Sequence, residues 1–89
     1  MSEALAAKMA ELSARFAAQA GVTRERLAAQ REDRAAIVAE AHKLAGIAAM
    51  FGQPAIGVAA LALEERAESG GDYGEEWRQL DALLAELAA

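Results

Sequence analysis

The sequence has no cysteine, one histidine, one proline, one tryptophan, one tyrosine and two phenylalanines among its 89 residues. The absence of cysteine excludes disulfide bonds and thiolate metal sites. With a single histidine and few hydroxyl side chains, little remains from which to build a catalytic triad or a metal cage. Basic residues number 9 against 14 acidic ones, which gives a formal net charge of −5. We therefore expect no binding to nucleic acid or to an anionic membrane surface.

Long hydrophobic runs are also missing. No apolar stretch approaches the roughly 20 residues of a membrane-spanning helix. Glu3 and Lys8 interrupt the N-terminal segment, where a signal peptide would have an apolar core. We expect a soluble, cytoplasmic protein. The content of 55% hydrophobic and 26% charged residues is typical of a folded chain, and the length fits one domain over residues 1–89.

The hydrophobic pattern predicts helices. Alanine, the best helix former, is the commonest residue, and the period-two alternation typical of strands is absent. A first helix is predicted over about residues 2–19, and Gly21 is expected to end it. Its apolar face is formed by Leu5, Met9, Leu12 and Phe16. A short helix is expected to follow, with Thr23 as its N-cap.

Three longer helices are predicted after the short one. The first begins near the N-cap Asp33 and runs to about Phe51, the second has Pro54 in its first turn, and the third has Asp72 as its N-cap. Their predicted core positions are Ile37, Ala41, Leu44, Ala48, Phe51, Ile56, Ala60, Leu63, Ala67, Tyr73, Trp77, Leu80, Leu84 and Leu87. Short loops make consecutive helices antiparallel neighbours. The predicted fold is all-α, an up-and-down antiparallel four-helix bundle with an additional short helix.

The single histidine, His42, lies about 100° around its helix from the core position Ala41, at the edge of the apolar stripe. Its neighbours on that face are small or apolar, namely Val38, Ala39, Ala45, Gly46 and Ala49. A glycine inside a helix costs about 1 kcal/mol relative to alanine. Access for a docking partner or a phosphoryl group is a physical reason for Gly46. A lone histidine at a core edge is more often structural, and both interpretations are open at this point.

A carboxylate is predicted beside His42. In an antiparallel hairpin that turns near Gly52, residues whose numbers add up to about 105 or 106 lie at the same height. This places Leu63 or Glu64 opposite His42, and Leu63 belongs to the core. A carboxylate that accepts a hydrogen bond from Nδ1–H leaves Nε2 unprotonated and facing outward, as a phosphoryl acceptor requires. The alternative is that Glu64 is an ordinary solvated glutamate.

The stretch His42-Lys43-Leu44-Ala45-Gly46-Ile47-Ala48, followed by Phe51-Gly52, resembles the motif of histidine-containing phosphotransfer (HPt) domains. The resemblance covers essentially the whole chain. It implies that His42 carries a phosphoryl group, that Glu64 orients the histidine, and that Gly46 leaves room for the partner. One position departs from the family pattern: the lysine usual three residues after the histidine is Ala45 here.

The resemblance further implies a phosphoryl carrier rather than an enzyme. Its partners would be the receiver domains of response regulators and a histidine kinase or hybrid kinase. The chain would hold no cofactor of its own, since Mg²⁺ is expected on the receiver. The expected docking residues are Val38, Ala39, Ala45, Gly46, Ala49 and Met50. Lys43 is either surface charge or a phosphate contact.

A second function from a different class is compatible with the same residues. The chain could be a non-catalytic helical adaptor or inhibitor that binds a receiver or a kinase through the His42 face without phosphotransfer. The absent lysine keeps this alternative open. We expect a monomer, because the predicted helices already close a bundle of their own.

Overall fold

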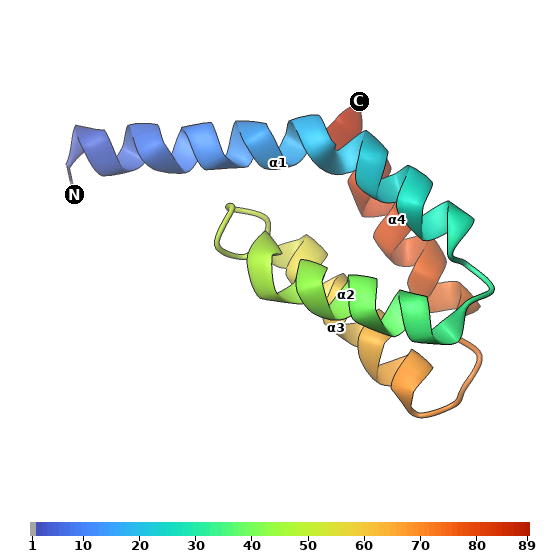
Figure 1. Ribbon diagram of the computed structural model, residues 1–89. Coiled ribbons are helices and arrows are strands. Elements are labelled where there is room, and N and C mark those ends of the chain that lie inside the picture. The colour runs from blue at the N-terminus through green and yellow to red at the C-terminus, as the bar shows by residue number, and fades with distance from the viewer. Residues whose placement is uncertain (1) are drawn as a thin grey trace.

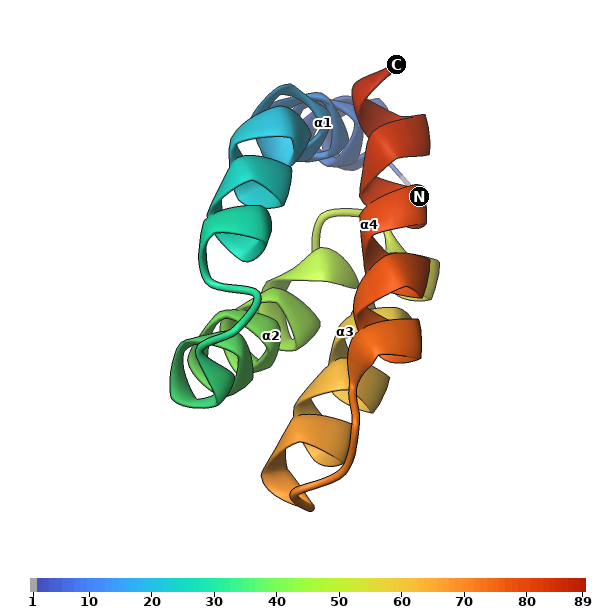
Figure 2. The same cartoon turned by 90° about the vertical axis from the view of Figure 1, so that its right-hand side faces the viewer.

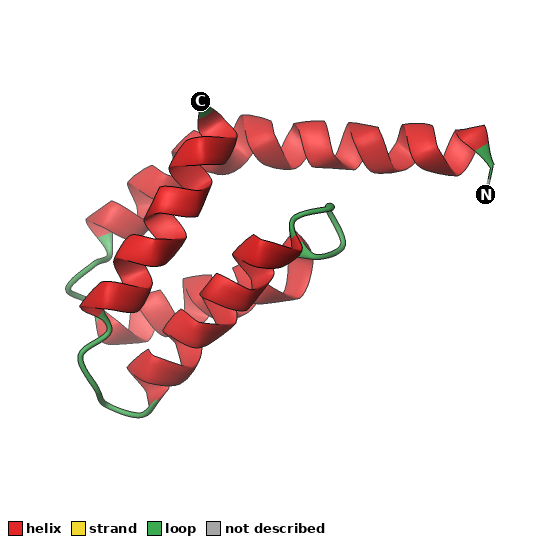
Figure 3. Cartoon of the chain, turned by 180° about the vertical axis from the view of Figure 1, so that it is seen from behind, coloured by secondary structure: helices red, strands yellow, loops and turns green. Residues whose placement is uncertain are grey.

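Four helices follow one another in the computed structural model, which describes residues 2–89 (Figure 1). They are α1 (Glu3–Ala29), α2 (Arg34–Ala48), α3 (Pro54–Glu68) and α4 (Gly74–Ala88). Loops join them, and the described residues contain no strand (Figure 3). The prediction of an all-helical bundle is confirmed. None of these four helices is long and apolar enough to cross a membrane.

Capping residues determine where the later helices begin. The Asp33 side chain accepts a hydrogen bond from the backbone N–H of Ala36 at 3.1 Å, as expected of an N-cap. Pro54 occupies the first turn of α3, where its missing N–H costs no helical hydrogen bond. The N-cap of α4 is Tyr73 rather than the predicted Asp72, so α4 begins one residue later than predicted. The Asp72 side chain nevertheless accepts a hydrogen bond from the N–H of Gly74 at 2.9 Å.

The prediction of an additional short helix after Gly21 is wrong, because α1 continues without a break through Gly21 to Ala29. Thr23 does not cap a new helix. Its hydroxyl donates to the carbonyl of Gln19, one turn back, at 3.1 Å. The cost of a mid-helix glycine is about 1 kcal/mol, and burial of one face of α1 on both sides of Gly21 offsets it. The residues buried on that face are Phe16, Ala20, Thr23 and Leu27.

The helices pack as two pairs (Figure 2). α2 and α3 form a hairpin with the closest packing in the molecule, α1 packs against α4, and α4 also packs on α3. α1 and α2 have little contact with each other. The turn of the hairpin begins after Ala48, three residues before the predicted end at Phe51, and includes Gly52 with a φ of 79°. That left-handed conformation favours glycine.

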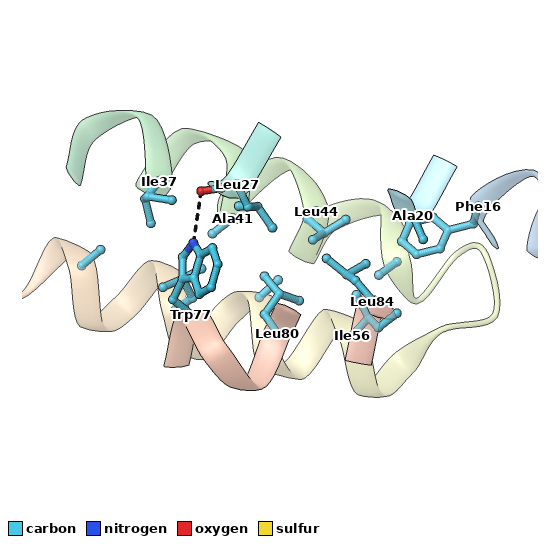
Figure 4. Packing of buried hydrophobic residues seen from close by; sticks show 14 residues of the cluster. Phe16, Ala20, Leu27, Ile37, Ala41, Leu44, Ile56, Trp77, Leu80 and Leu84 are labelled. Atoms are coloured by element: carbon cyan, nitrogen blue, oxygen red, sulfur yellow. Dashed lines mark hydrogen bonds between the residues drawn. The ribbon is translucent and has the colours of Figure 1, made fainter. Parts of the chain in front are cut away.

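One apolar core lies between the pairs, and the predicted core positions within α2 and α3 are buried in it. Phe51, also predicted as core, lies in the turn after α2 and is only partly buried. In α4 Trp77, Leu80 and Leu84 are buried and Leu87 is partly buried. Tyr73, the residue before α4, is also partly buried at the margin of the core. The Trp77 indole N–H donates to the carbonyl of Leu27 at 3.2 Å and so ties α4 to α1 (Figure 4).

A paired guanidinium and carboxylate also join α1 to α4. Arg24 donates to both carboxylate oxygens of Asp81, at 2.8 and 3.1 Å. The hydrogen bond and the negative charge of Asp81 raise the pKa of the Arg24 guanidinium above its ordinary value. The C-terminal half of α1 is therefore held to α4 by polar contacts as well as by the core.

The N-terminal part of α1 lies outside this core. Of the predicted apolar face only Phe16 is buried, whereas Leu5 and Met9 are exposed and Leu12 is partly exposed. Figure 1 shows this end of α1 projecting beyond the other three helices. The predicted apolar face is therefore uncovered at Leu5 and Met9, because no other helix within residues 2–89 extends that far along α1.

Candidate functional site

His42 lies on α2 at the edge of the hairpin with α3. Its side chain is 77% exposed, whereas the preceding residue, Ala41, is buried. The ring Nδ1 lies 2.7 Å from Oε2 of Glu64 on α3. The hairpin register therefore brings together the two residues that the sequence predicts to be opposite each other.

Glu64 is held in place by burial, since its side chain is only 12% exposed. An ionised carboxylate only accepts hydrogen bonds, so the short contact assigns the proton to Nδ1 of His42. In the neutral ring, Nε2 then carries a free lone pair. With Nδ1 held against α3, Nε2 is the ring nitrogen that a partner can reach from solvent.

A shallow hollow lies beside the histidine, and residues from both α2 and α3 form its wall. It is lined by His42, Ala45, Gly46, Gly57, Leu61 and Glu64. A Cβ built on Gly57 would lie 3.7 Å from the carbonyl oxygen of Ala45, so α3 runs close to α2 here. No lysine or arginine is among the lining residues. The hollow therefore contains the Nε2 lone pair of His42 and an apolar rim, but no positively charged side chain lines it.

Gly46 contributes open space. A Cβ built on it would meet nothing within 4 Å, and its backbone has an ordinary helical conformation. Packing inside the chain therefore does not require glycine at this position. Because Gly46 has no side chain, the surface beside His42, one turn along α2, is left open to solvent.

The expected docking residues divide into two groups by exposure. Ala39, Gly46, Ala49 and Met50 are exposed, whereas Val38 and Ala45 are partly buried and pack against the core. All six lie on α2 or in the turn that follows it.

Lys43 lies on a different side of α2 from His42. It lines a separate hollow between α1 and α2, together with Leu44 and Ile47. Consecutive helical residues point about 100° apart, and this separates the two side chains. The structure does not bring Lys43 to the hollow that contains His42.

Leu61 is a site residue absent from the expected docking set. It is a large apolar side chain that is exposed on α3, and it lines the hollow beside His42. In this hairpin, His42 and Glu64 are opposite each other and their residue numbers add up to 106. The numbers of Ala45 and Leu61 add up to the same value, so the hairpin register could have identified Leu61. Within residues 2–89, no group of three histidine, aspartate or glutamate side chains could hold a metal ion.

A family model described as Hpt domain matches residues 3–89 and so spans all four helices. Searches among curated proteins and among solved structures found no match.

Proposed function

Because the chain belongs to the Hpt domain family, we propose that His42 is its phosphoacceptor and exchanges a phosphoryl group with the aspartate of receiver domains. Hpt domains are histidine phosphotransfer modules of phosphorelays, and they interact with receiver domains and histidine kinases. They are phosphocarriers rather than enzymes. The observation that carries the assignment to His42 is the 2.7 Å contact between its Nδ1 and Glu64, which leaves Nε2 free at an exposed helix edge.

What this chain contributes to the chemical step is the lone pair on Nε2. This lone pair attacks the phosphorus of the aspartyl phosphate on the receiver. The N–P bond forms as the bond between phosphorus and the aspartate oxygen breaks, and the aspartate leaves as a carboxylate. Nδ1 keeps its proton and its hydrogen bond to Glu64 throughout. Transfer in the other direction uses the same atoms in reverse.

Glu64 serves as a positioning residue in this proposal. Its buried carboxylate fixes the tautomer and the orientation of the imidazole before the receiver arrives. Holding the nucleophile in line with the scissile bond removes part of the entropic barrier to transfer.

The positive charge that stabilises the transferring phosphoryl group is supplied by the partner. The hollow around His42 has no lysine or arginine, and Ala45 stands where the family usually has a lysine. We assign the cations, including Mg²⁺, to the receiver, and no cofactor to this chain. Lys43 receives no phosphate contact in this proposal, because it lines the other side of α2.

The receiver is proposed to dock on the apolar surface around His42. Ala39, Gly46, Ala49 and Met50 on the α2 side, with Leu61 on α3, form a surface of small or apolar side chains. The two partly buried residues, Val38 and Ala45, support this surface from below. We propose that the chain acts in the cytoplasm, where it encounters receiver domains.

Phosphotransfer from a panel of phosphorylated receiver domains tests the assignment. We expect acid-labile, alkali-stable phosphate on the wild-type protein and none on His42→Gln, because glutamine lacks a nucleophilic ring nitrogen. Lys43→Gln is the matched control, since it changes the next exposed residue on the same helix. It should retain transfer within about twofold, because Lys43 lies outside the hollow.

The absence of a cation beside His42 favours one other function, that of a non-catalytic adaptor. In that case, a receiver would bind wild-type protein and His42→Gln equally well, and neither protein would take up phosphate. Calorimetric titration of the same receivers distinguishes the two functions. Binding without label supports the adaptor and contradicts the carrier.

A further inference from the structure

An open hollow lies at the end of the molecule where the α1–α2 loop meets the α3–α4 loop (Figure 1). Its volume of about 540 Å³ is within the range of about 300–1,000 Å³ typical of small-molecule sites. Three arginines line it, namely Arg31, Arg34 and Arg78. It shares no lining residue with the hollow beside His42, and Arg34 precedes His42 by about 12 Å along α2. The arginine hollow is therefore separate from the phosphoacceptor site.

The three arginines of this hollow have no carboxylate partner. The cationic side chains that form ion pairs within residues 2–89 are Lys8, Arg15, Arg24, Arg26 and His42. No carboxylate oxygen in the described part of the chain lies within 4 Å of a guanidinium nitrogen of Arg31, Arg34 or Arg78. Direct contact with an acidic side chain therefore does not neutralise the positive charge of the hollow.

Aromatic rings hold two of the guanidinium groups. Arg31 lies over the ring of Trp77, with Cζ 4.3 Å from the ring centroid, and Arg34 lies over Tyr73 at 5.0 Å. The Tyr73 hydroxyl also donates to the backbone carbonyl of Arg31 at 2.6 Å. An aromatic face fixes the position of a guanidinium without cancelling its charge.

Most guanidinium N–H groups in the hollow have no acceptor within the protein. The arginine side chains that donate hydrogen bonds within residues 2–89 are Arg15, Arg24, Arg34 and Arg66. Arg34 uses only Nη1, which donates to the carbonyls of Ala67 and Gly71 at 2.8 and 2.9 Å. The other nitrogens of Arg34 and all those of Arg31 and Arg78 remain available as donors.

Two carboxylates, those of Glu32 and Asp72, also line the hollow. Asp72 accepts a hydrogen bond from the backbone N–H of Gly74 at 2.9 Å, and Glu32 is exposed. Three arginines against two carboxylates leave a surplus of positive charge, on a chain whose formal net charge is −5. The charge of the hollow thus favours an anion, although the charge of the whole chain does not.

We propose that this hollow binds an anion that carries a diphosphate group. Guanidinium groups suit phosphate because their planar N–H pairs match two phosphate oxygens. Tyr73 and Trp77 are one helical turn apart, with roughly 5–6 Å between Cβ atoms, and each carries one stacked arginine. This separation suits two adjacent phosphate groups. The proposal goes beyond the proposed function and does not depend on it.

Arg78 provides the third contact with the anion. Its guanidinium lies over the first turn of α4, where a Cβ built on Gly74 would be 3.4 Å from Nη1. The ligand would thus contact the α1–α2 loop through Arg31, the start of α2 through Arg34 and the start of α4 through Arg78. Because it would connect these three segments, binding should stabilise the folded chain.

Fluorescence of Trp77, the only tryptophan of the chain, tests the proposal, because Arg31 is stacked on its ring. Titration of the wild type with inorganic pyrophosphate at constant ionic strength should give a saturable change in emission. Saturating pyrophosphate should also raise the Tm. Inorganic phosphate should bind at least about tenfold more weakly, because it cannot reach both stacked arginines.

Arg78→Gln should weaken binding of pyrophosphate about tenfold, since it removes charge-assisted hydrogen bonds to the anion. Arg78 is exposed, and the arginine stacked on Trp77 is Arg31, so the variant should keep both the fold and the fluorescent reporter. Arg15→Gln is the matched control, because it removes the same charge from an exposed side chain on α1. It should bind pyrophosphate as the wild type does. Circular dichroism verifies that both variants are folded.

Titration with ADP distinguishes two sources of the diphosphate group. Tighter binding of ADP than of pyrophosphate assigns the hollow to a nucleotide, and equal or weaker binding assigns it to a free diphosphate.

Four results would overturn the proposal. They are no saturable response to pyrophosphate up to about 10 mM, unchanged affinity in Arg78→Gln, equal affinity for phosphate and pyrophosphate, and an equal response to citrate. An arginine cluster that only holds the two loops together would give the first of these results. Equal binding of citrate would mean that the hollow attracts negative charge without recognising phosphate.

Discussion

At His42, chemical behaviour depends on which ring nitrogen holds the proton, and Glu64 determines this. The carboxylate lies at hydrogen-bond distance from Nδ1 and is itself nearly buried. A buried carboxylate with one partner has few alternative positions, so the ring orientation it imposes is rigid. The proposed phosphoacceptor is exposed, whereas the residue proposed to orient it is enclosed.

Glu64→Gln should slow phosphotransfer on the order of tenfold while leaving the fold intact. Glutamine has nearly the same shape but removes the charge that stabilises the Nδ1–H tautomer. Initial rates of transfer from a phosphorylated receiver measure the loss. Nitrogen chemical shifts of the His42 ring should show a mixture of tautomers in the variant and one dominant tautomer in the wild type.

Glu65→Gln is the control for that substitution, because Glu65 is the next residue on α3 and is exposed. It removes the same charge without touching the ring. Equal slowing by both variants would mean that net charge, rather than the contact with Nδ1, governs the rate.

Gly46→Ala should affect stability and function in opposite directions. A methyl group there meets nothing within 4 Å, and alanine in a helix is favoured over glycine by about 0.5–1 kcal/mol. The free energy of unfolding should rise by that amount in a denaturant titration. Transfer from receivers should nevertheless slow, because the methyl group stands on the approach to His42.

At the scale of helices, the apolar spacing in α2 gave a correct prediction, whereas the glycine in α1 gave a wrong one. The spacing of Ile37, Ala41, Leu44 and Ala48 predicted the buried face of α2 correctly, and the short turn then set the register with α3. Gly21 was interpreted as a helix end, although α1 continues through it. Local propensity weighs against a glycine by about 1 kcal/mol only, and packing of the flanking face exceeds this.

Gly21→Ala should stabilise the chain by about 0.5–1 kcal/mol, because Gly21 is exposed inside α1 and a Cβ there meets nothing within 4 Å. The midpoint of urea unfolding measures the gain. The variant is also the matched control for Gly46→Ala. Both add a methyl group to an open helical glycine, but Gly21→Ala should leave phosphotransfer unchanged. A similar slowing in both variants would exclude a steric role for Gly46.

At the scale of the whole molecule, α4 links the two helix pairs. It packs on both α1 and α3, and Leu80 and Leu84 are fully buried in the core between the pairs. The hydrogen bond from Trp77 to Leu27 fixes the height of α4 along α1. The hairpin that carries His42 is thereby supported from one side and left open on the other.

Leu80→Ala should lower the free energy of unfolding by about 2–5 kcal/mol, because it removes a fully buried side chain and leaves a cavity between the pairs. Val22→Ala, at an exposed position of α1, should change it by no more than about 0.5 kcal/mol. Thermal unfolding followed by circular dichroism measures both. Comparable losses in the two variants would show that α4 does not connect the pairs as described.

The sequence by itself determined the helical class, the buried faces of α2, α3 and most of α4, and the neighbourhood of His42 and Glu64. These follow from residue spacing and from one short turn, both of which are local properties of the chain. Only the tertiary structure decided which side of α2 each neighbouring helix covers, that Lys43 and His42 line different hollows, and that the N-terminal end of α1 lies outside the core. Periodicity identifies the face of a helix that is apolar, but whether that face is buried depends on which other helices reach it.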